Sequence, residues 1–153
     1  MRVIVDANIV FSGILNSKGK IGDLLINSRK YLEFIAPDFL REEIFKHYPR
    51  LCKISGMALE QVWESEFQVC KDITFISEEQ IKHSTWLAAE KLVADIDPKD
   101  THYVAYQNTF VAKSGVDTKN LWMDLQRKAV QILSQLTSFL SGDKTKKKKS
   151  NGS

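Results

Sequence analysis

The sequence predicts an α/β domain built on a parallel sheet, and two observations support this prediction. Short apolar segments at residues 2–6, 32–36 and 72–77 have the length and the β-branched or aromatic content of buried strands. Segments of helical periodicity lie between them, and strands that alternate with helices form parallel sheets. The expected architecture is therefore a parallel sheet sandwiched by helices.

The first half of the chain supplies two strands and two helices. The run Val3 to Val5 indicates the first strand, and apolar residues at helical spacing predict a helix over 19–30. A helix over 38–48 follows the second strand, bounded by Pro37 and Pro49.

The second half continues the alternation. Helices are predicted over 58–71 and 78–94 on either side of the third strand, and Ser77 has the spacing of a capping box for the second of them. A further helix is predicted from Pro98, with Asp97 as its N-cap.

Length, charge and cysteine content limit the class of protein. At 153 residues the chain fits one domain with a sizeable core. Its net charge of +3 belongs to residues 142–153, whose five lysines and one aspartate contribute +4 and leave −1 for the rest. This lysine block could hold nucleic-acid phosphates, although a solvated end is the simpler interpretation. No disulfide framework, zinc knuckle, signal peptide or membrane span is indicated, so a cytoplasmic protein is expected.

Two acids occupy unusual places in this pattern. Asp6 ends the first predicted strand, and ligands of open α/β sheets bind beyond the carboxyl ends of strands. A turn or helix cap explains Asp6 equally well. Glu43 falls between Phe39 and Leu40 on the apolar side of its helix, where an unpaired charge is costly. The alternative is an edge position from which Glu43 reaches water or Lys46.

The helix after Pro98 adds a third acid. Asp97 has a sufficient structural role as a cap, whereas Asp100 shares a face with Tyr103 that points toward the sheet. The simpler interpretation is that Asp100 interacts with the positive end of its helix. Three inward carboxylates without histidine or cysteine companions form an oxygen-only site that suits Mg²⁺ or Mn²⁺. Such an ion can activate water and stabilise a leaving oxygen, so nuclease chemistry is the natural hypothesis.

Three segments, VIVDANIVFSGIL, APDFLREEIFKH and DIDPKDTHYVAYQ, resemble the PIN-domain nucleases in order and separation. This family includes the ribonuclease toxins of bacterial toxin–antitoxin pairs. The resemblance covers residues 1–109 and implies a magnesium-dependent endoribonuclease that hydrolyses single-stranded RNA. Single-stranded RNA is then the expected substrate, and an antitoxin protein and a second copy of the chain are candidate partners.

The resemblance also assigns roles to individual residues. It implies that the catalytic acids and metal ligands are Asp6, Glu43 and Asp100. Asn8 matches the polar residue that supports the first aspartate, and Asp97 is a second supporting residue. A strand that ends in polar residues is then explained by a metal pocket at its tip.

The chain departs from the family pattern after residue 109. The family continues with a strand and an S-G-D-x-x-L or T-x-D-x-x-L motif, whereas this chain continues VAKSGVDTKNLWMDLQ without a clear strand. Asp117 and Asp124 are candidate replacements for the missing acid, each more simply explained as an incidental surface residue. Residues 110–141 are predicted to form an atypical, helical end in which the last strand is missing or replaced by a helix over about 120–140. Residues 142–153 are predicted to be a disordered tail.

A frameshift would explain this departure. Codons formed across the junctions from Lys113 to Leu121 permit the sequence I-W-S-G-x-K-K-L, which is the missing strand and motif. The junction at x, between Asp117 and Thr118, encodes only Tyr or His and never Asp. Our hypothesis is a single-nucleotide shift near Phe110, which the alternative frame of the gene would test.

Two other classes compete with the nuclease. A catalytically impaired domain would bind RNA or a protein partner without cleaving. A phosphatase or a phospho-receiver domain also places an aspartate at a strand end, but Asn8 and Val10 break the D-x-D-x-T phosphatase signature. The first strand also lacks the adjacent acid pair of a receiver.

Overall fold

The computed structural model describes residues 1–94, 98–111, 127, 128 and 131. In this part of the chain three parallel strands pair in the order β1-β2-β3, with Ile4 opposite Ile35 and Ile35 opposite Thr74. The strands are β1 (Arg2–Ile4), β2 (Glu33–Pro37) and β3 (Ile73–Ile76). The predicted parallel sheet is confirmed, although β1 ends two residues earlier than expected.

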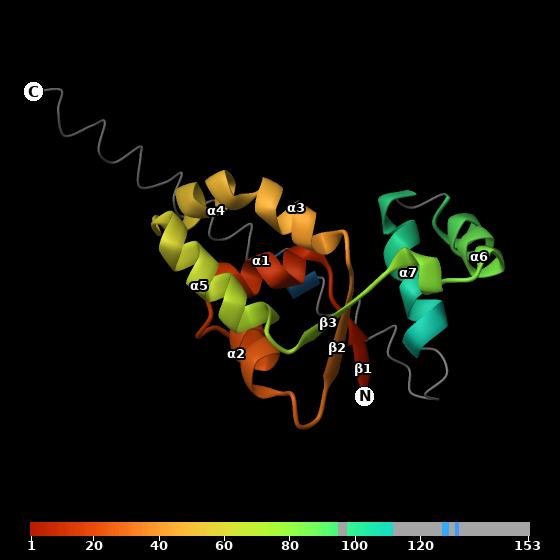
Figure 1. Ribbon diagram of the computed structural model, residues 1–153, viewed down its shortest axis with the longest axis horizontal. Helices are drawn as coiled ribbons and strands as arrows, with labels where there is room; N and C mark the ends of the chain where they lie inside the picture. The colour runs from red at the N-terminus through yellow and green to blue at the C-terminus, as the bar shows by residue number, and fades with distance from the viewer. Residues whose placement is uncertain (95–97, 112–126, 129–130, 132–153) are drawn as a thin grey trace, which may run out of the picture.

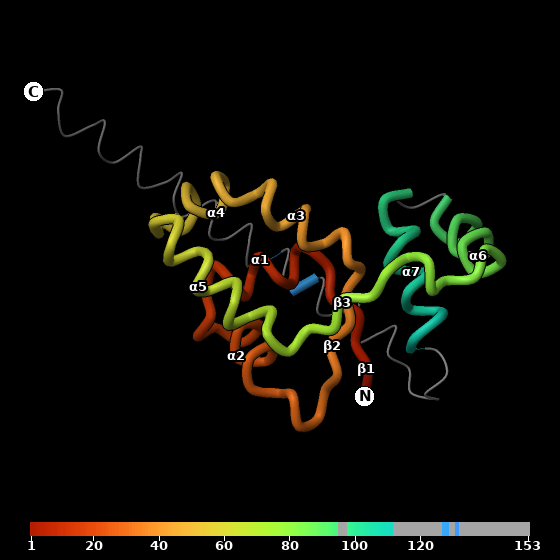
Figure 2. Tube along the Cα trace, in the orientation of Figure 1, coloured from red at the N-terminus to blue at the C-terminus, as the bar shows by residue number. Residues whose placement is uncertain are grey.

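Helices cover both faces of the sheet (Figure 1). One side carries α1 (Ala7–Leu15), α2 (Lys20–Asn27), α3 (Leu40–Lys46), α4 (Tyr48–Ser55) and α5 (Leu59–Cys70). The chain then crosses after β3 to the other side, where it forms α6 (His83–Val93) and α7 (Thr101–Tyr106) (Figure 2). Short helical turns complete this side: the 3₁₀ helices η1 (Glu78–Gln80) and η2 (Pro98–Asp100) and the π-helix η3 (Gln107–Val111).

Alternate residues of each strand enter two separate cores. Val3 and Phe34 join the core under α1 to α5, whereas Ile4 and Ile35 join the core under α6 and α7. All four side chains are no more than 1% exposed. Because both faces are covered, the strands are continuously apolar rather than alternating, which is the pattern that predicted them.

The helix α1 was absent from the sequence prediction. Its sequence ANIVFSGIL contains β-branched Ile9 and Val10, which are weak helix formers. Six of its nine residues are buried, against α2, α3, α4 and α5, so no polar face marks its helical period. Tertiary burial, rather than intrinsic propensity, therefore makes this segment helical.

Two predicted helices have different boundaries in the structure. The helix expected over 38–48 is two helices that break at His47, and Pro49 lies in the first turn of α4 instead of ending the segment. Proline lacks an N–H and is tolerated in a first turn, so it serves as a start signal here. The helix expected over 78–94 begins as the 3₁₀ turn η1, which Ser77 caps by accepting a hydrogen bond from the Glu79 N–H at 3.3 Å, and α6 starts only at His83.

Several predictions fall outside the described residues. They are the Asp97 cap, the acids Asp117 and Asp124, most of the helix over about 120–140 and the tail over 142–153. The three described residues within 120–140, which are Arg127, Lys128 and Gln131, are helical. In the described part of the chain, no helix has the length and apolar character needed to cross a membrane.

Candidate active site

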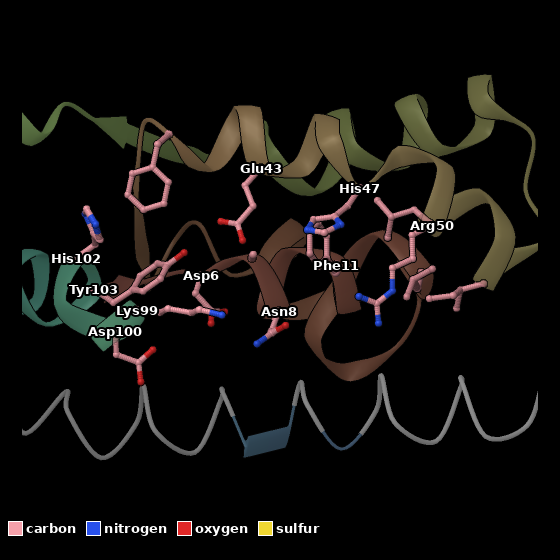
Figure 3. Close-up of a pocket in the computed structure, with 15 residues that line it drawn as sticks. Asp6, Asn8, Phe11, Glu43, His47, Arg50, Lys99, Asp100, His102 and Tyr103 are labelled. Atoms are coloured by element: carbon pink, nitrogen blue, oxygen red, sulfur yellow. The ribbon is translucent and has the colours of Figure 1, made fainter. Parts of the chain in front are cut away.

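A pocket of about 510 Å³ opens beyond the carboxyl ends of the strands. The acids predicted from the sequence, Asp6, Glu43 and Asp100, all line it, as does Asn8. Figure 3 shows them on separate elements: the start of α1, α3 and the turn before α7. The fold therefore gathers into one pocket three acids that are far apart in sequence.

Asp6 is both a helix cap and a pocket residue. Its Oδ1 accepts a hydrogen bond of 2.9 Å from the Ile9 N–H, which satisfies one of the free amides of the first turn of α1. The side chain is 7% exposed and lines the pocket. The positive end of α1 favours the ionised carboxylate at this position. The cap predicted for Asp6 is therefore confirmed, and its place in the pocket is compatible with the ligand role, which stays a prediction.

Glu43 is held at the pocket by its helix. Leu40 and Ile44 on α3 are fully buried, and this anchoring turns the neighbouring Glu43 toward the pocket while Glu42 is exposed. No ion pair joins Glu43 to Lys46 in the described part of the chain. Glu43 therefore does not reach Lys46, which was one of the alternatives for its side chain.

Asp100 and Lys99 enter the pocket from η2. In Figure 3 the Asp100 carboxylate points away from Glu43 and Asp6, whereas the Lys99 side chain extends toward Asp6. Both residues line the cavity. The acidic end of the pocket therefore also contains a cationic side chain, which the motif comparison did not single out.

Tyr103 lies at the centre of the acidic end. Burial raises the pKa of its phenol, and the negative charges of Asp6, Glu43 and Asp100 raise that pKa further, while a hydrogen bond from the Ala7 backbone N–H opposes the rise. The phenol therefore stays protonated at neutral pH and offers one O–H donor among three carboxylates. Because all three acids raise the pKa of Tyr103, Asp100 belongs to the same electrostatic cluster as Asp6 and Glu43.

The donor set fits a divalent cation held by few protein ligands. Among the described residues, no group of three histidine, cysteine, aspartate or glutamate side chains is close enough to hold one ion. Mg²⁺ is usually bound through one or two carboxylates together with waters and substrate phosphates. Asp6 and Glu43, with the amide of Asn8, supply hard oxygen donors of this kind in one pocket.

The other end of the pocket is basic and apolar, and it was not predicted from the sequence. His47 and Arg50 line it together with Phe11, whose ring meets the His47 ring edge to face at 5.2 Å. Arg50 lies beyond Pro49, where the predicted helix was expected to have ended. The signal that could have found these residues is a second helix starting at Pro49.

His102 closes the side of the pocket near α7. Its ring lies between the rings of Phe39 and Trp86, at 5.0 and 5.1 Å, and its Nδ1 is 2.7 Å from a Glu78 oxygen. These contacts tie α7 to the loop that precedes α3 and to η1. They fix the orientation of η2 and α7, from which Lys99, Asp100 and Tyr103 project.

The family model of the PIN domain matches residues 4–131. The match covers most of the chain, so the protein belongs to the PIN-domain family. It also extends beyond residue 109, where the resemblance based on the three motifs ends. No curated protein and no solved structure matches the chain.

Membership indicates the general chemistry. PIN domains are generally nucleases that use divalent metals, so a nuclease-type function is indicated for this chain. Among the described residues, the acidic end of the pocket offers carboxylate and amide oxygens of the kind that such chemistry uses.

Proposed function

We propose that this protein is a magnesium- or manganese-dependent endoribonuclease that hydrolyses single-stranded RNA in the pocket beside α1. The observation that carries the proposal is that Asp6, Glu43 and Asp100, from three separate elements, line one cavity and all act on the Tyr103 phenol. The nuclease character of the family supports it.

Each residue has a defined part in this proposal. Asp6 and Glu43 hold the divalent cation, and Asn8 supports them. When bound, the cation supplies the charge that activates water and stabilises the departing oxygen of the phosphodiester. Asp100 adds negative charge from η2, and the neutral Tyr103 phenol donates a hydrogen bond within the cluster. The cap of α1 fixes the Asp6 carboxylate before substrate arrives.

The test measures cleavage of an end-labelled single-stranded RNA with Mg²⁺ or Mn²⁺. Asp6→Asn and Glu43→Gln should each lower the cleavage rate by about a hundredfold or more, because each removes a charged oxygen donor. Glu42→Gln is the matched control, since Glu42 is the exposed neighbour of Glu43 and lies outside the pocket. Chelation with EDTA should also stop cleavage. Undiminished cleavage by the Asp6→Asn variant would refute the proposal.

A catalytically impaired PIN domain that only binds RNA is the second candidate. It is favoured by the absence, among described residues, of a three-carboxylate group that could hold one ion. Binding of single-stranded RNA without cleavage, in the presence of either metal, would support this candidate over the first.

A toxin role is proposed on the family resemblance alone. If the protein is the ribonuclease of a toxin–antitoxin pair, its expression in bacteria should arrest growth, whereas expression of the Asp6→Asn variant should not. An antitoxin would then be sought as a protein that purifies with the chain and restores growth. A homodimer, the other proposed assembly, would appear as a doubled mass in solution.

A further inference from the structure

One face of α4, together with its N-cap residue His47, forms the wall of the pocket farthest from Asp100. We call it the α4 wall. Its members recur at helical spacing, and they are His47, Arg50, Leu51 and Ile54. Figure 3 shows His47 and Arg50 at the opposite end of the pocket from Asp100 and His102. The pocket thus has an acidic end, at the start of α1, and a basic and apolar end, at α4.

Arg50 has no acidic or aromatic partner within residues 1–94 and 98–111. Among residues 1–94 and 98–111, Arg2 and Arg29 pair with carboxylates and Arg41 stacks on Phe75 at 3.8 Å. In the same part of the chain no ion pair or ring contact involves Arg50, which is exposed. A guanidinium group presents a planar fork of donors that matches the oxygens of a phosphate.

The surroundings of Arg50 suit the rest of a nucleotide. The His47 and Phe11 rings stand at an interplanar angle of 83°, and Leu15 and Ile54 add apolar surface. Nucleobases of single strands pack on aromatic and apolar surfaces of this kind because every base has a π face. A base within a duplex is already stacked and is not available for such contacts.

Distance separates this wall from the acids. Asn8, Phe11 and Leu15 line the pocket on successive turns of α1, and at about 1.5 Å per residue the stretch from Asn8 to Leu15 is about 10 Å long. A phosphate held by a hydrogen bond lies about 3 Å from its donor. One phosphate therefore cannot occupy both ends of the pocket, and a group bound at Arg50 is a second one.

We propose that the α4 wall is a subsite for the nucleotide next to the scissile phosphate, with Arg50 binding its phosphate and the His47–Phe11 corner packing against its base. This inference rests on the proposed ribonuclease function, because it is the acidic end that would hold the phosphate to be cleaved. The subsite makes the substrate an unpaired strand of at least two nucleotides. His47 and Arg50 then act in substrate binding rather than in the chemical step.

The experiment measures binding of the full chain to a fluorescent, unstructured RNA decamer in EDTA, so that no cleavage occurs. Arg50→Ala is compared with Lys53→Ala, because Lys53 is an exposed cation on the same helix that does not line the pocket. Both variants lose one charge, and both keep the lysine-rich segment at 142–153. Urea unfolding of each variant shows that it is folded.

Arg50→Ala should weaken binding about tenfold and reduce the slope of log affinity against log salt by about 0.7, the value for one lost phosphate contact on a single strand. Lys53→Ala should change affinity less than about twofold. Arg50→Lys should recover part of the affinity, since it restores the charge but not the fork. Equal losses in the Arg50→Ala and Lys53→Ala variants would overturn the phosphate contact.

The base contact is tested with an abasic strand of the same length. The unmodified protein should bind the abasic strand more weakly than the decamer, and His47→Ala should reduce that difference. An unchanged difference in the His47→Ala variant would overturn the base contact. Failure of the inference is distinguishable from failure of the proposed function. If Asp6→Asn abolishes cleavage but Arg50→Ala leaves RNA binding unaltered, only the subsite is refuted. If the unmodified protein binds RNA through Arg50 but never cleaves it, only the ribonuclease function is refuted.

Discussion

At the scale of single residues, Asp6 shows how one side chain can both cap a helix and line the pocket. One carboxylate oxygen caps α1 through the Ile9 N–H, and the side chain faces a cavity that Glu43 also lines. The Tyr103 hydroxyl oxygen accepts a hydrogen bond from the backbone N–H of Ala7, at the start of the same helix. The first turn of α1 is therefore fastened by the groups that form the acidic end of the pocket, which keeps those groups in place without substrate.

The double role of Asp6 predicts different stabilities for two substitutions. Asp6→Asn retains a good cap and should change the free energy of unfolding by no more than about 0.5 kcal/mol, whereas Asp6→Ala loses the cap and should cost about 0.5–2 kcal/mol. Urea unfolding followed by circular dichroism measures both. If the two variants were equally destabilised, the charge rather than the hydrogen bond would be what supports α1.

At the scale of elements, the first turn of α2 packs closely against the backbone that precedes it. A Cβ atom added at Gly22 would lie 2.5 Å from the Ser17 carbonyl oxygen and 2.6 Å from that of Asn16. The chain between α1 and α2 thus folds back onto the first turn of α2. Gly56, by contrast, ends α4 with a φ of 71°, and a Cβ atom added there would meet nothing within 4 Å. The two glycines are required for different reasons, one steric and one conformational.

The glycines predict an order of destabilisation. Alanine normally favours a helix by about 1 kcal/mol over glycine. Gly22→Ala should nevertheless destabilise the protein, by about 1–3 kcal/mol, because backbone oxygens must move. Gly56→Ala should cost about 1 kcal/mol for the left-handed conformation alone. Urea midpoints of the two variants check the order, and a Gly22→Ala protein as stable as the unmodified one would show that the chain before α2 adapts freely.

At the scale of the whole molecule, thiol and phenol groups on both sides of the sheet keep their protons to a higher pH than usual. Burial raises the pKa of the Cys70 thiol to about 12, and the Glu66 charge adds to this rise. Burial, followed by a hydrogen bond to Glu66, raises the pKa of Tyr48. Burial likewise raises the pKa of Tyr106, whose hydroxyl donates a hydrogen bond of 2.6 Å to the Ile76 carbonyl. The folded state therefore keeps protons that the unfolded chain releases in alkali.

This difference predicts a loss of stability at high pH. The ordinary pKa values are 9.0 for the thiol and 10.0 for the phenols, and the folded values are higher. The contribution of these groups is complete below pH 9.0 and is lost as the pH rises through the folded pKa values. Urea midpoints should be constant from about pH 7 to 8.5 and fall above that range.

A variant identifies the source of that fall. Tyr106→Phe should make the alkaline decrease shallower, at the cost of the Ile76 hydrogen bond, about 1–3 kcal/mol at neutral pH. Tyr31→Phe, which changes a residue that is 71% exposed, is the control and should leave the pH profile unaltered. A profile that is equally steep in the Tyr106→Phe variant would mean that other groups govern the alkaline transition.

Much of the sheet and part of the site could be predicted from the sequence. The strands were recognisable because residues on both of their faces, such as Val3, Ile4 and Phe34, are apolar. Glu43 was recognisable because its charge interrupts the apolar side of α3. The helix α1 was missed because Ile9 and Val10 favour strands and almost all of its residues are buried. The division at His47 was missed because proline can either end a helix or begin one.

The sequence by itself determined the family, the parallel sheet and the acids of the pocket, because apolar runs and motif spacing are local properties of the chain. Only the tertiary structure decided which side chains meet them there. Tyr103 enters the acidic cluster, Lys99 extends toward Asp6, and Arg50 forms part of the α4 wall. They line one pocket because helices on both sides of the sheet converge at the carboxyl ends of the strands. Convergence of this kind depends on how helices pack, and no spacing along the chain records it.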